Sequence, residues 1–285
     1  MEIVKTIREM QSRVNAQREL KHAIAFAPTM GFLHEGHMTL LREGRKRGDF
    51  LVLSIFVNPT QFGPNEDLDA YPRNLERDLA LAEKEGVDAV FTPDKKELYG
   101  EGYETYVSLE TLPHHLCGLS RPVHFRGVST VVTKLFNIVK PHVALFGEKD
   151  FQQLAVIRRM VKDLNFDIEI VGVPTVREPD GLAMSSRNTY LSAVERVSAL
   201  SLSKALKLAQ ERVAQGERNA AAILKEVRSF IESHPGAVID YAALCDPSSL
   251  TDVAAVDRPA LLALAVKVGK TRLIDNAIIT INMSG

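Results

Sequence analysis

The first two thirds of the chain alternate between apolar runs and stretches with helical spacing, and this alternation limits the possible folds more than any other feature. Residues 49–59, DFLVLSIFVNP, form an apolar run rich in branched side chains, as expected of a strand buried on both faces. Residues 35–48 before it and 74–86 after it carry apolar positions at helical spacing. Strands that alternate with helices predict βαβ units, and therefore an α/β fold with a doubly wound, mainly parallel sheet.

This pattern continues to residue 174 and then changes. Further strands are expected at residues 22–29, 87–93, 141–148 and 166–174, and further helices at residues 1–20, 127–140 and 150–165. After a polar stretch come two long helical segments and three strand-like runs, at residues 193–215, 217–234, 237–245, 260–268 and 271–280. We therefore expect two domains, residues 1–176 with the parallel sheet and residues 177–285 as a smaller α+β domain.

The composition excludes several classes of protein. Of the 285 residues, 45% are hydrophobic, which is enough for a full core, and the formal net charge of -1 provides no basic field for nucleic acid. The two cysteines, Cys117 and Cys245, are far apart and form no CxxC pair, so we expect neither a disulfide scaffold nor a cysteine-based zinc site. The charged N-terminus lacks an apolar signal core, and no apolar run is long enough to span a bilayer. These features predict a soluble, cytoplasmic protein without a membrane partner.

Residues 29–41, TMGFLHEGHMTLL, follow a predicted strand and open a predicted helix. His34 and His37 are three residues apart, whereas the zincin metal motif needs histidines four apart, so a metal site is the weaker interpretation. A phosphate site fits better, because helix N-termini offer free N–H groups, and Gly31 and Gly36 allow close approach of a ligand. A simple corner with two surface histidines is an equally open alternative.

Two further polar clusters follow predicted strands. Asn58 and Gln61 end the strand at residues 49–59, where amides can bind hydroxyls or a carboxylate, although an Asn-Pro turn is the plainer role for Asn58. Lys149 follows another strand and suits a phosphate, while Asp150 is placed to cap the next helix. Ligands of doubly wound sheets bind beyond the carboxyl ends of the strands, so these clusters predict one site.

The stretch GLAMSSRN, residues 181–188, lies at the predicted domain boundary. Two hydroxyls and an arginine on a loop suit triphosphate binding and closure of a lid. An ordinary linker with a capping serine is the alternative interpretation.

Taken together, six stretches resemble one known family in the expected order from residue 28 to residue 276: PTMGFLHEGH, FVNPTQF, HFRGVSTVV, FGEKDFQQL, GVPTVREPDGLAMSSRN and TRLIDN. The chain is similar to the pantothenate synthetases (pantoate–β-alanine ligases), a family of the nucleotidylyltransferase superfamily with its His-x-x-His motif. The resemblance implies a Rossmann-like fold and a two-step reaction. Pantoate and ATP give pantoyl adenylate and pyrophosphate, and β-alanine then gives pantothenate and AMP, with Mg²⁺ accompanying ATP. It also implies a homodimer and a C-terminal domain that closes over the nucleotide.

The resemblance also implies roles for individual residues. The catalytic residues are His34, His37 and Lys149, with His37 as the proton donor or as a hydrogen-bond donor only. ATP-binding residues are Met30, Gly31, His34, Gly36, His37, Gly147, Glu148, Lys149, Asp150, Val176, Met184, Ser185, Ser186 and Arg187. Pantoate would contact Gln61, Gln153 and Asn58, β-alanine would contact Gln61 and Asn58, and further pocket positions are Tyr71, Arg121 and His124. No residue is assigned to the metal, and Asp78 is a candidate Mg²⁺ ligand.

Three other functions remain open at this level. Another nucleotidylyltransferase would share the first turn but would not need two amide-bearing acceptor clusters. A non-catalytic ATP-sensing module would have no need of His34, His37 and Lys149 together. A metal-binding protein would take up zinc through the two histidines and would form no product from ATP.

Overall fold

The computed structural model describes residues 1–64 and 66–281, and its internal contacts divide the chain into two compact units. The first unit comprises Met1–Glu110, Arg121–Glu148 and Gln153–Thr175, and the second comprises Thr111–Ser120, Lys149–Gln152 and Val176–Gly285. The second unit thus includes two short segments that precede residue 176. The division into functional domains at residue 176 stays a prediction.

The first unit contains a six-stranded parallel sheet, which confirms the predicted α/β class. In chain order its strands are β1 (Glu2–Val4), β2 (Ile24–Thr29), β3 (Phe50–Ile55), β4 (Ala89–Phe91), β5 (Val143–Gly147) and β6 (Glu169–Val173). Their spatial order is β1-β4-β3-β2-β5-β6. The chain moves from β2 to one side and later returns to β5 on the other, so the order of the strands reverses between β2 and β5. Ligands of such sheets bind at this reversal, outside the carboxyl ends of the strands.

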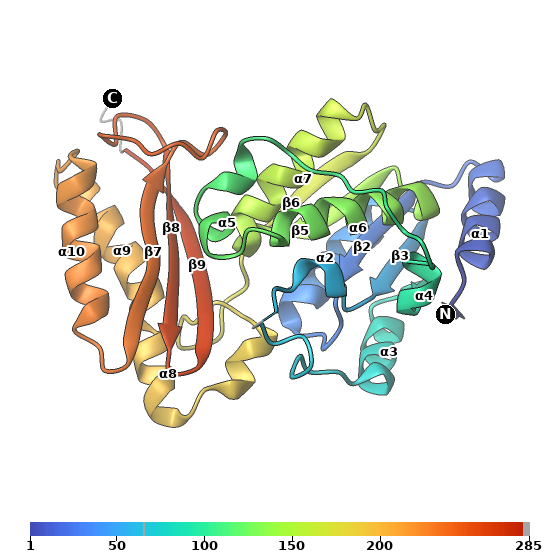
Figure 1. Ribbon diagram of the computed structural model, residues 1–285, viewed down its shortest axis with the longest axis horizontal. Coiled ribbons are helices and arrows are strands. Elements are labelled where there is room, and N and C mark those ends of the chain that lie inside the picture. Colours follow the sequence, from blue (N-terminus) through green and yellow to red (C-terminus); the bar gives the residue numbers. More distant parts are fainter. Residues whose placement is uncertain (65, 282–285) are drawn as a thin grey trace. The chain divides into compact units, whose positions relative to one another are not determined.

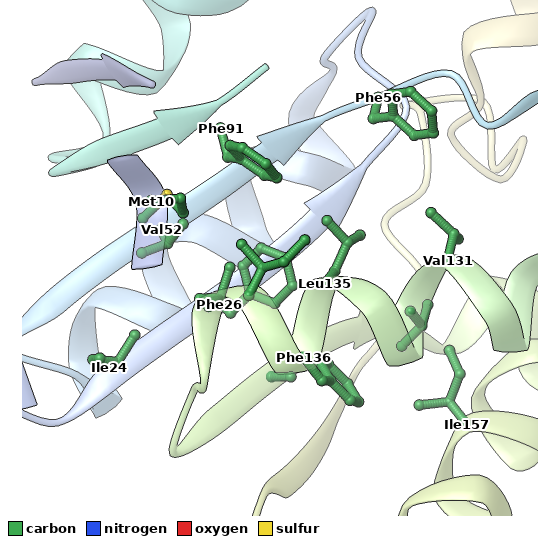
Figure 2. Packing of buried hydrophobic residues seen from close by; sticks show 14 of the residues in the cluster. Met10, Ile24, Phe26, Val52, Phe56, Phe91, Val131, Leu135, Phe136 and Ile157 are labelled. Atoms are coloured by element: carbon green, nitrogen blue, oxygen red, sulfur yellow. The ribbon is translucent and has the colours of Figure 1, made fainter. Parts of the chain in front are cut away.

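Both faces of this sheet are covered by helices, as Figure 1 shows. The helices of this unit are α1 (Ile7–Glu19), α2 (Glu35–Arg47), α3 (Leu75–Lys84), α4 (Lys95–Leu98), α6 (His124–Val139) and most of α7 (Phe151–Asp163). The short helix α5 (Cys117–Ser120) belongs to the second unit. Phe26 of β2 meets Phe136 of α6 edge to face, with ring centroids 6.5 Å apart (Figure 2). Its neighbours Ala25 and Ala27 point to the opposite face, into a cluster that includes Leu41 of α2. This alternation explains why the strands read as continuous apolar runs.

The N-terminal segment differs from the expected helix over residues 1–20. Glu2–Val4 form the edge strand β1, paired with β4, and the helix begins only after Thr6. Thr6 accepts a hydrogen bond from the backbone N–H of Glu9, and the Glu9 carboxylate accepts the N–H of Thr6, which fixes the start of α1. Only Ile3 and Val4 of this strand are apolar, and Glu2 and Lys5 flank them, so the pattern resembled the charged helix that follows.

The second unit contains the predicted α+β arrangement. Its antiparallel sheet consists of β7 (Ala237–Cys245), β8 (Ala260–Val268) and β9 (Thr271–Ile279), and its helices are α8 (Ala193–Ala199), α9 (Ser201–Ala214) and α10 (Ala220–Glu232) (Figure 1). The single helix expected at residues 193–215 is therefore two helices. The break is at Leu200, whose carbonyl also accepts the hydroxyl of Ser203.

Candidate active site

The turn from β2 into α2, residues 29–37 and here called the histidine turn, holds the two predicted histidines side by side. His34 is the N-cap of α2, with extended backbone angles, and His37 lies one turn into the helix. The spacing of three residues places both rings on one face, and their centroids are 4.0 Å apart. Both side chains are half-buried. The structure therefore brings His34 and His37 together at the carboxyl end of the central strand.

One hydrogen bond determines which nitrogen of His37 carries a proton. The backbone N–H of His34 donates to Nδ1 of His37 over 3.2 Å. An N–H group needs a lone pair to accept its hydrogen, so Nδ1 of His37 is unprotonated in this arrangement. The neutral ring then carries its proton on Nε2. His37 consequently presents Nε2–H as a hydrogen-bond donor.

Gly36 is required by the position of the His34 ring. A Cβ atom on Gly36 would lie 2.9 Å from Cε1 of His34, a separation that real Cβ atoms essentially never show, and 3.0 Å from its Nδ1. Gly36 was predicted to let a ligand approach the backbone. The structure gives this glycine a role inside the protein, because any larger residue would displace the imidazole.

The backbone of the histidine turn is held by Asp78, in the first turn of α3. Gly31 and Phe32 both have positive φ angles, 82° and 49°, a conformation that is costly for a side chain as large as Phe32. The carboxylate of Asp78 accepts the N–H of Phe32 and the N–H of Leu33, each over 2.7 Å. Charge-assisted hydrogen bonds of this length are strong and offset the cost of the conformation.

Asp78 was considered as a Mg²⁺ ligand, and its surroundings argue for a different role. Its side chain is 1% exposed, and each of its two oxygens accepts a backbone N–H. Burial raises the pKa of Asp78, while the N–H groups of Leu33 and Phe32 oppose the shift. Asp78 therefore positions the histidine turn. The sequence offered no signal for this contact, because 45 residues separate Leu33 from Asp78.

Gln61 lies after β3 in the short 3₁₀ helix Pro59–Gln61, and Asn58 orients its amide. The Asn58 amide donates to Oε1 of Gln61 over 3.0 Å and to the carbonyl of Gly127 over 3.1 Å. Its oxygen accepts the hydroxyls of Thr60 and Tyr99, both over 2.9 Å. Both Asn58 N–H groups and its oxygen are thus used inside the protein. This arrangement favours an orienting role for Asn58 over the predicted direct contact with pantoate or β-alanine.

Two of the remaining pocket positions of the first unit contact the backbone of Gln61. The carbonyl of Gln61 accepts hydrogen bonds from Nη2 of Arg121 over 3.3 Å and from Nδ1 of His124 over 3.0 Å. Because a carbonyl only accepts, His124 carries a proton on Nδ1. Arg121 also pairs with Glu66, and the ring of Tyr71 packs edge to face on Phe62. These contacts place Arg121 and His124 around Gln61 and place Tyr71 in the neighbouring packing.

Gly147 and Glu148 follow β5, the other strand at the reversal of strand order. A Cβ atom on Gly147 would have no atom of the described chain within 4 Å, so the packing of these residues does not require glycine there. The carboxylate of Glu148 lies beside Gly172 of β6, where a Cβ would come within 2.9 Å of Oε1. Gln153, half-buried in the first turn of α7, belongs to the same unit.

In the second unit, Lys149, Arg177, Met184, Asp275 and Asn276 form a group that we call the lysine cluster. Nζ of Lys149 donates to the carbonyl of Met184 over 2.9 Å, and the amide of Asn276 donates to the carbonyl of Lys149 over 2.8 Å. Burial lowers the pKa of Lys149, while the carboxylates of Asp150 and Asp275 oppose the shift. The cluster thus fixes both the backbone and the amine of Lys149.

Arg177 and Asp275 form the frame of the lysine cluster. The guanidinium of Arg177 donates to both oxygens of Asp275, over 2.7 and 2.9 Å, and the Asp275 side chain is 2% exposed. A two-pronged pair of this kind fixes geometry as well as charge. Both residues stand in stretches that carry the family resemblance, yet the sequence assigned them no role. The stretches themselves were the signal that could have identified them.

The loop with the predicted triphosphate ligands is a hairpin followed by a 3₁₀ helix. The N–H of Met184 donates to the carbonyl of Val176 over 2.9 Å, which pairs the two ends of the hairpin. Ser185 caps the helix Ser186–Tyr190 by accepting the N–H of Arg187 over 3.3 Å, the capping role named as the alternative for this stretch. Ser186 is buried in the same helix. The predicted site residues therefore fall in both units.

Comparison with known proteins decides the family. The sequence profile of the pantoate–beta-alanine ligases matches residues 2–278. The chain belongs to the pantoate–beta-alanine ligase family. It is 63% identical over 279 residues to the pantothenate synthetase of Desulfatibacillum aliphaticivorans, covering 98% of this chain and 99% of that one. Membership of the family confirms the predicted ligase and supports neither the other nucleotidylyltransferase nor the sensing module.

Solved structures of pantoate–beta-alanine ligases share the fold of this chain. The crystal structure of pantothenate synthetase from Thermus thermophilus superposes with a TM-score of 0.94 at 44% identity, covering 98% of this chain and 100% of that one. The enzyme from Francisella tularensis, crystallised with beta-gamma ATP and beta-alanine, gives a TM-score of 0.82 at 34% identity, covering 98% and 97%. No helix within residues 1–64 and 66–281 combines the length and the apolar character that crossing a membrane requires.

Proposed function

We propose that this ligase condenses pantoate with β-alanine through a pantoyl adenylate. In the first step a carboxylate oxygen of pantoate bonds to the α-phosphorus of ATP, and the bond from that phosphorus to pyrophosphate breaks. In the second step the amine of β-alanine bonds to the acyl carbon, the bond to AMP breaks, and the amine loses a proton to the solvent. The products are pantothenate, AMP and pyrophosphate.

The observation that carries this proposal is the hydrogen bond from the backbone N–H of His34 to Nδ1 of His37, which leaves Nε2 as the donor. This Nε2–H group is a donor fixed in direction by the bond between Nδ1 and the backbone of His34. It lies at the N-terminus of α2, where the helix dipole also favours negative charge. A donor placed before the reaction begins stabilises charge that develops on the phosphate in the transition state. We assign His37 this role, with His34 beside it.

The nucleotide is assigned to the ATP-binding residues that the family resemblance implies. Lys149, Ser185, Ser186 and Arg187 supply cationic and hydroxyl groups for the β- and γ-phosphates. Backbone groups near Met30, Gly31, Val176 and Met184 frame the adenine and ribose, and Gly147, Glu148 and Asp150 border the nucleotide. Support comes from the bond between Lys149 and the Met184 carbonyl, which holds the amine beside the loop that contains Ser185.

The acceptor acids are assigned to the amides of Gln61 and Gln153. Oε1 of Gln61 accepts from Asn58, and this bond leaves its Nε2 as the donor group, here 3.3 Å from Sδ of Met30. An amide fixed in this way can donate to the carboxylate or a hydroxyl of pantoate, and to β-alanine in the second step. Arg121, His124 and Tyr71 complete the pocket around it.

Mg²⁺ belongs to this proposal as part of the Mg–ATP substrate. Phosphate oxygens and water form most of its coordination shell, as is usual for this ion. Both oxygens of Asp78 are bonded to the backbone, so we assign Asp78 to the histidine turn and not to the metal. We also propose a homodimer, a closing domain at residues 177–285 and a cytoplasmic location, as the sequence predicts. The mass of the protein in solution tests the dimer.

A product assay with Mg–ATP and pantoate, with and without β-alanine, tests the reaction. We expect AMP and pantothenate in equal amounts, and turnover only when both acids are present. In a single-turnover experiment without β-alanine, we expect pyrophosphate release that depends on pantoate. Release of pyrophosphate independent of pantoate would overturn the adenylate route.

A further inference from the structure

Three residues outside the proposed reaction gather in the second unit. His115 precedes α5, Cys245 ends β7, and Asp252 lies in the segment that follows β7. Nε2 of His115 is 3.6 Å from Sγ of Cys245 and 3.0 Å from Oδ1 of Asp252, and Sγ is 3.5 Å from the same oxygen. Imidazole, thiolate and carboxylate are the three kinds of side chain that bind zinc in proteins.

The triangle formed by these three atoms has the size of one face of a zinc tetrahedron. Zinc bonds of about 2.3 Å to sulfur and about 2.0 Å to nitrogen and oxygen, at tetrahedral angles, separate sulfur from either lighter atom by about 3.5 Å. The same geometry separates nitrogen from oxygen by about 3.3 Å. The observed sides are 3.6, 3.5 and 3.0 Å, so a zinc ion fits with small side-chain movements.

The backbone already holds two of the three side chains in place. Cys245 and Asp252 face each other in an isolated antiparallel bridge, closed by the bond from the N–H of Val253 to the carbonyl of Leu244 over 3.0 Å. Cys245 is fully buried, whereas the Asp252 side chain is 70% exposed. One ligand is therefore anchored in the protein interior, and another is open to solvent and to an entering ion.

The side chain of Gln152 fixes the backbone around His115, the third candidate ligand. Its amide donates to the carbonyl of His115 over 2.7 Å and to the carbonyl of Leu112 over 2.9 Å, and its oxygen accepts the N–H of Cys117 over 3.0 Å. Gln152 is 6% exposed, so these bonds form in a protected environment. The segment that contains His115 is thus fixed before any ion binds.

We propose that His115, Cys245 and Asp252 form a zinc-binding site, with water as the fourth ligand. The thiol and the imidazole exclude Mg²⁺ and Ca²⁺, which prefer oxygen ligands, and favour a borderline-soft ion. On binding, the thiol releases its proton to the solvent and the sulfur donates to the metal. The ion joins the segment 111–120 to β7 and stabilises the second unit. The sequence argued against a cysteine-based zinc site, because the two cysteines are far apart and form no CxxC pair.

Zinc titration of the full-length chain tests this proposal. The protein is stripped with a chelator and titrated against a chromophoric zinc indicator, and we expect one ion per chain. His115→Ala and Cys245→Ala should each weaken binding by more than about tenfold, and Gln152→Ala by about tenfold through misplacement of His115. The matched controls are His114→Ala, an exposed neighbour, and Cys117→Ala, the other buried cysteine, which should bind as the parent does.

Two further measurements separate the metal site from a purely hydrogen-bonded group. Cobalt(II) bound at the site should show thiolate charge-transfer absorption that Cys245→Ser abolishes and Cys117→Ser preserves. Zinc should raise the Tm of the parent but not of Asp252→Asn, which keeps the size of this 70% exposed side chain and removes its charge. If the parent binds no zinc, or if the ligand variants bind it as well as the controls, the proposal is wrong.

Discussion

The histidine turn and the lysine cluster supply groups to the same proposed reaction but are built in opposite ways. The histidine turn is a continuous piece of chain, and a single distant residue, Asp78, fixes its backbone. The lysine cluster combines segments near residues 149, 177 to 184 and 275, and its amine donates to a carbonyl of its own unit. The first is a rigid donor fixed in advance, whereas the second spends one N–H of its amine on the protein and keeps further donors for the nucleotide of the proposed reaction.

The largest effect on activity is expected at His37, where two substitutions distinguish the role of Nδ1 from the role of Nε2. His37→Asn keeps an acceptor for the N–H of His34 but removes the distal donor, and His37→Gln does the reverse. We expect His37→Asn to lower the rate of adenylate formation by about a thousandfold, with its Tm close to that of the parent. His37→Gln should retain more activity and lose more stability. The opposite order in single-turnover rates would mean that His37 acts only as a cap for α2.

Asp78→Ala should show that the histidine turn depends on one carboxylate. Two short bonds to a charged acceptor are lost, and we expect the free energy of unfolding to fall by about 3 kcal/mol in urea titrations. Asp49→Ala is the matched control, since this exposed carboxylate accepts one N–H, that of Ala23, over 2.9 Å. Equal losses of unfolding free energy in the two variants would show that the two buried bonds of Asp78 stabilise the protein no more than the single exposed bond of Asp49.

Lys149→Met should lower kcat/KM for ATP by about a hundredfold, because the variant keeps the length of the side chain but loses its charge. Burial lowers the pKa of Lys149, so the fraction of charged amine falls at a lower pH than for an ordinary lysine. Activity should therefore fall as the pH rises through this lowered pKa. Lys149→Arg stays charged over the same range, and its profile should lack this alkaline limb. An identical limb in both proteins would assign the titration to another group.

The smallest expected effect separates two glycines. Gly147→Ala meets no atom of the described residues, so we expect unchanged stability and a KM for ATP raised about tenfold by contact with the nucleotide. Gly36→Ala places a methyl group against the His34 ring and should lower both stability and activity. Thermal unfolding and ATP titrations of the two variants make the comparison. An unchanged KM in Gly147→Ala would remove Gly147 from the nucleotide site.

The order of apolar and polar residues along the chain predicted both sheets, because the pattern within each strand depends on whether one or both of its faces are buried. Such patterns failed where a short strand is flanked by charged residues, as in Glu2–Val4, and where a helical pattern is interrupted at one residue, as at Leu200. The fold was therefore predictable in its layers and less so at its ends and breaks.

In the candidate site, too, some residues could be predicted from local sequence patterns and others could not. His34, His37 and Gln61 could be selected from the sequence because they stand where strands end and have suitable chemistry. Asp78 and Asp275 could not be assigned their roles, because each acts on residues far away in the chain through a contact that only folding creates. The orienting role of Asn58 was likewise hidden, since it depends on the carbonyl of Gly127.

The contact between Asp78 and the histidine turn also provides a way to observe this turn directly. Backbone amides in irregular, glycine-containing segments usually exchange their hydrogen with solvent quickly. The amides of Phe32 and Leu33 are instead bound to a buried carboxylate, so their hydrogens should exchange slowly with deuterated solvent. The exchange rate of these two amide hydrogens therefore reports how often the turn that presents His37 opens.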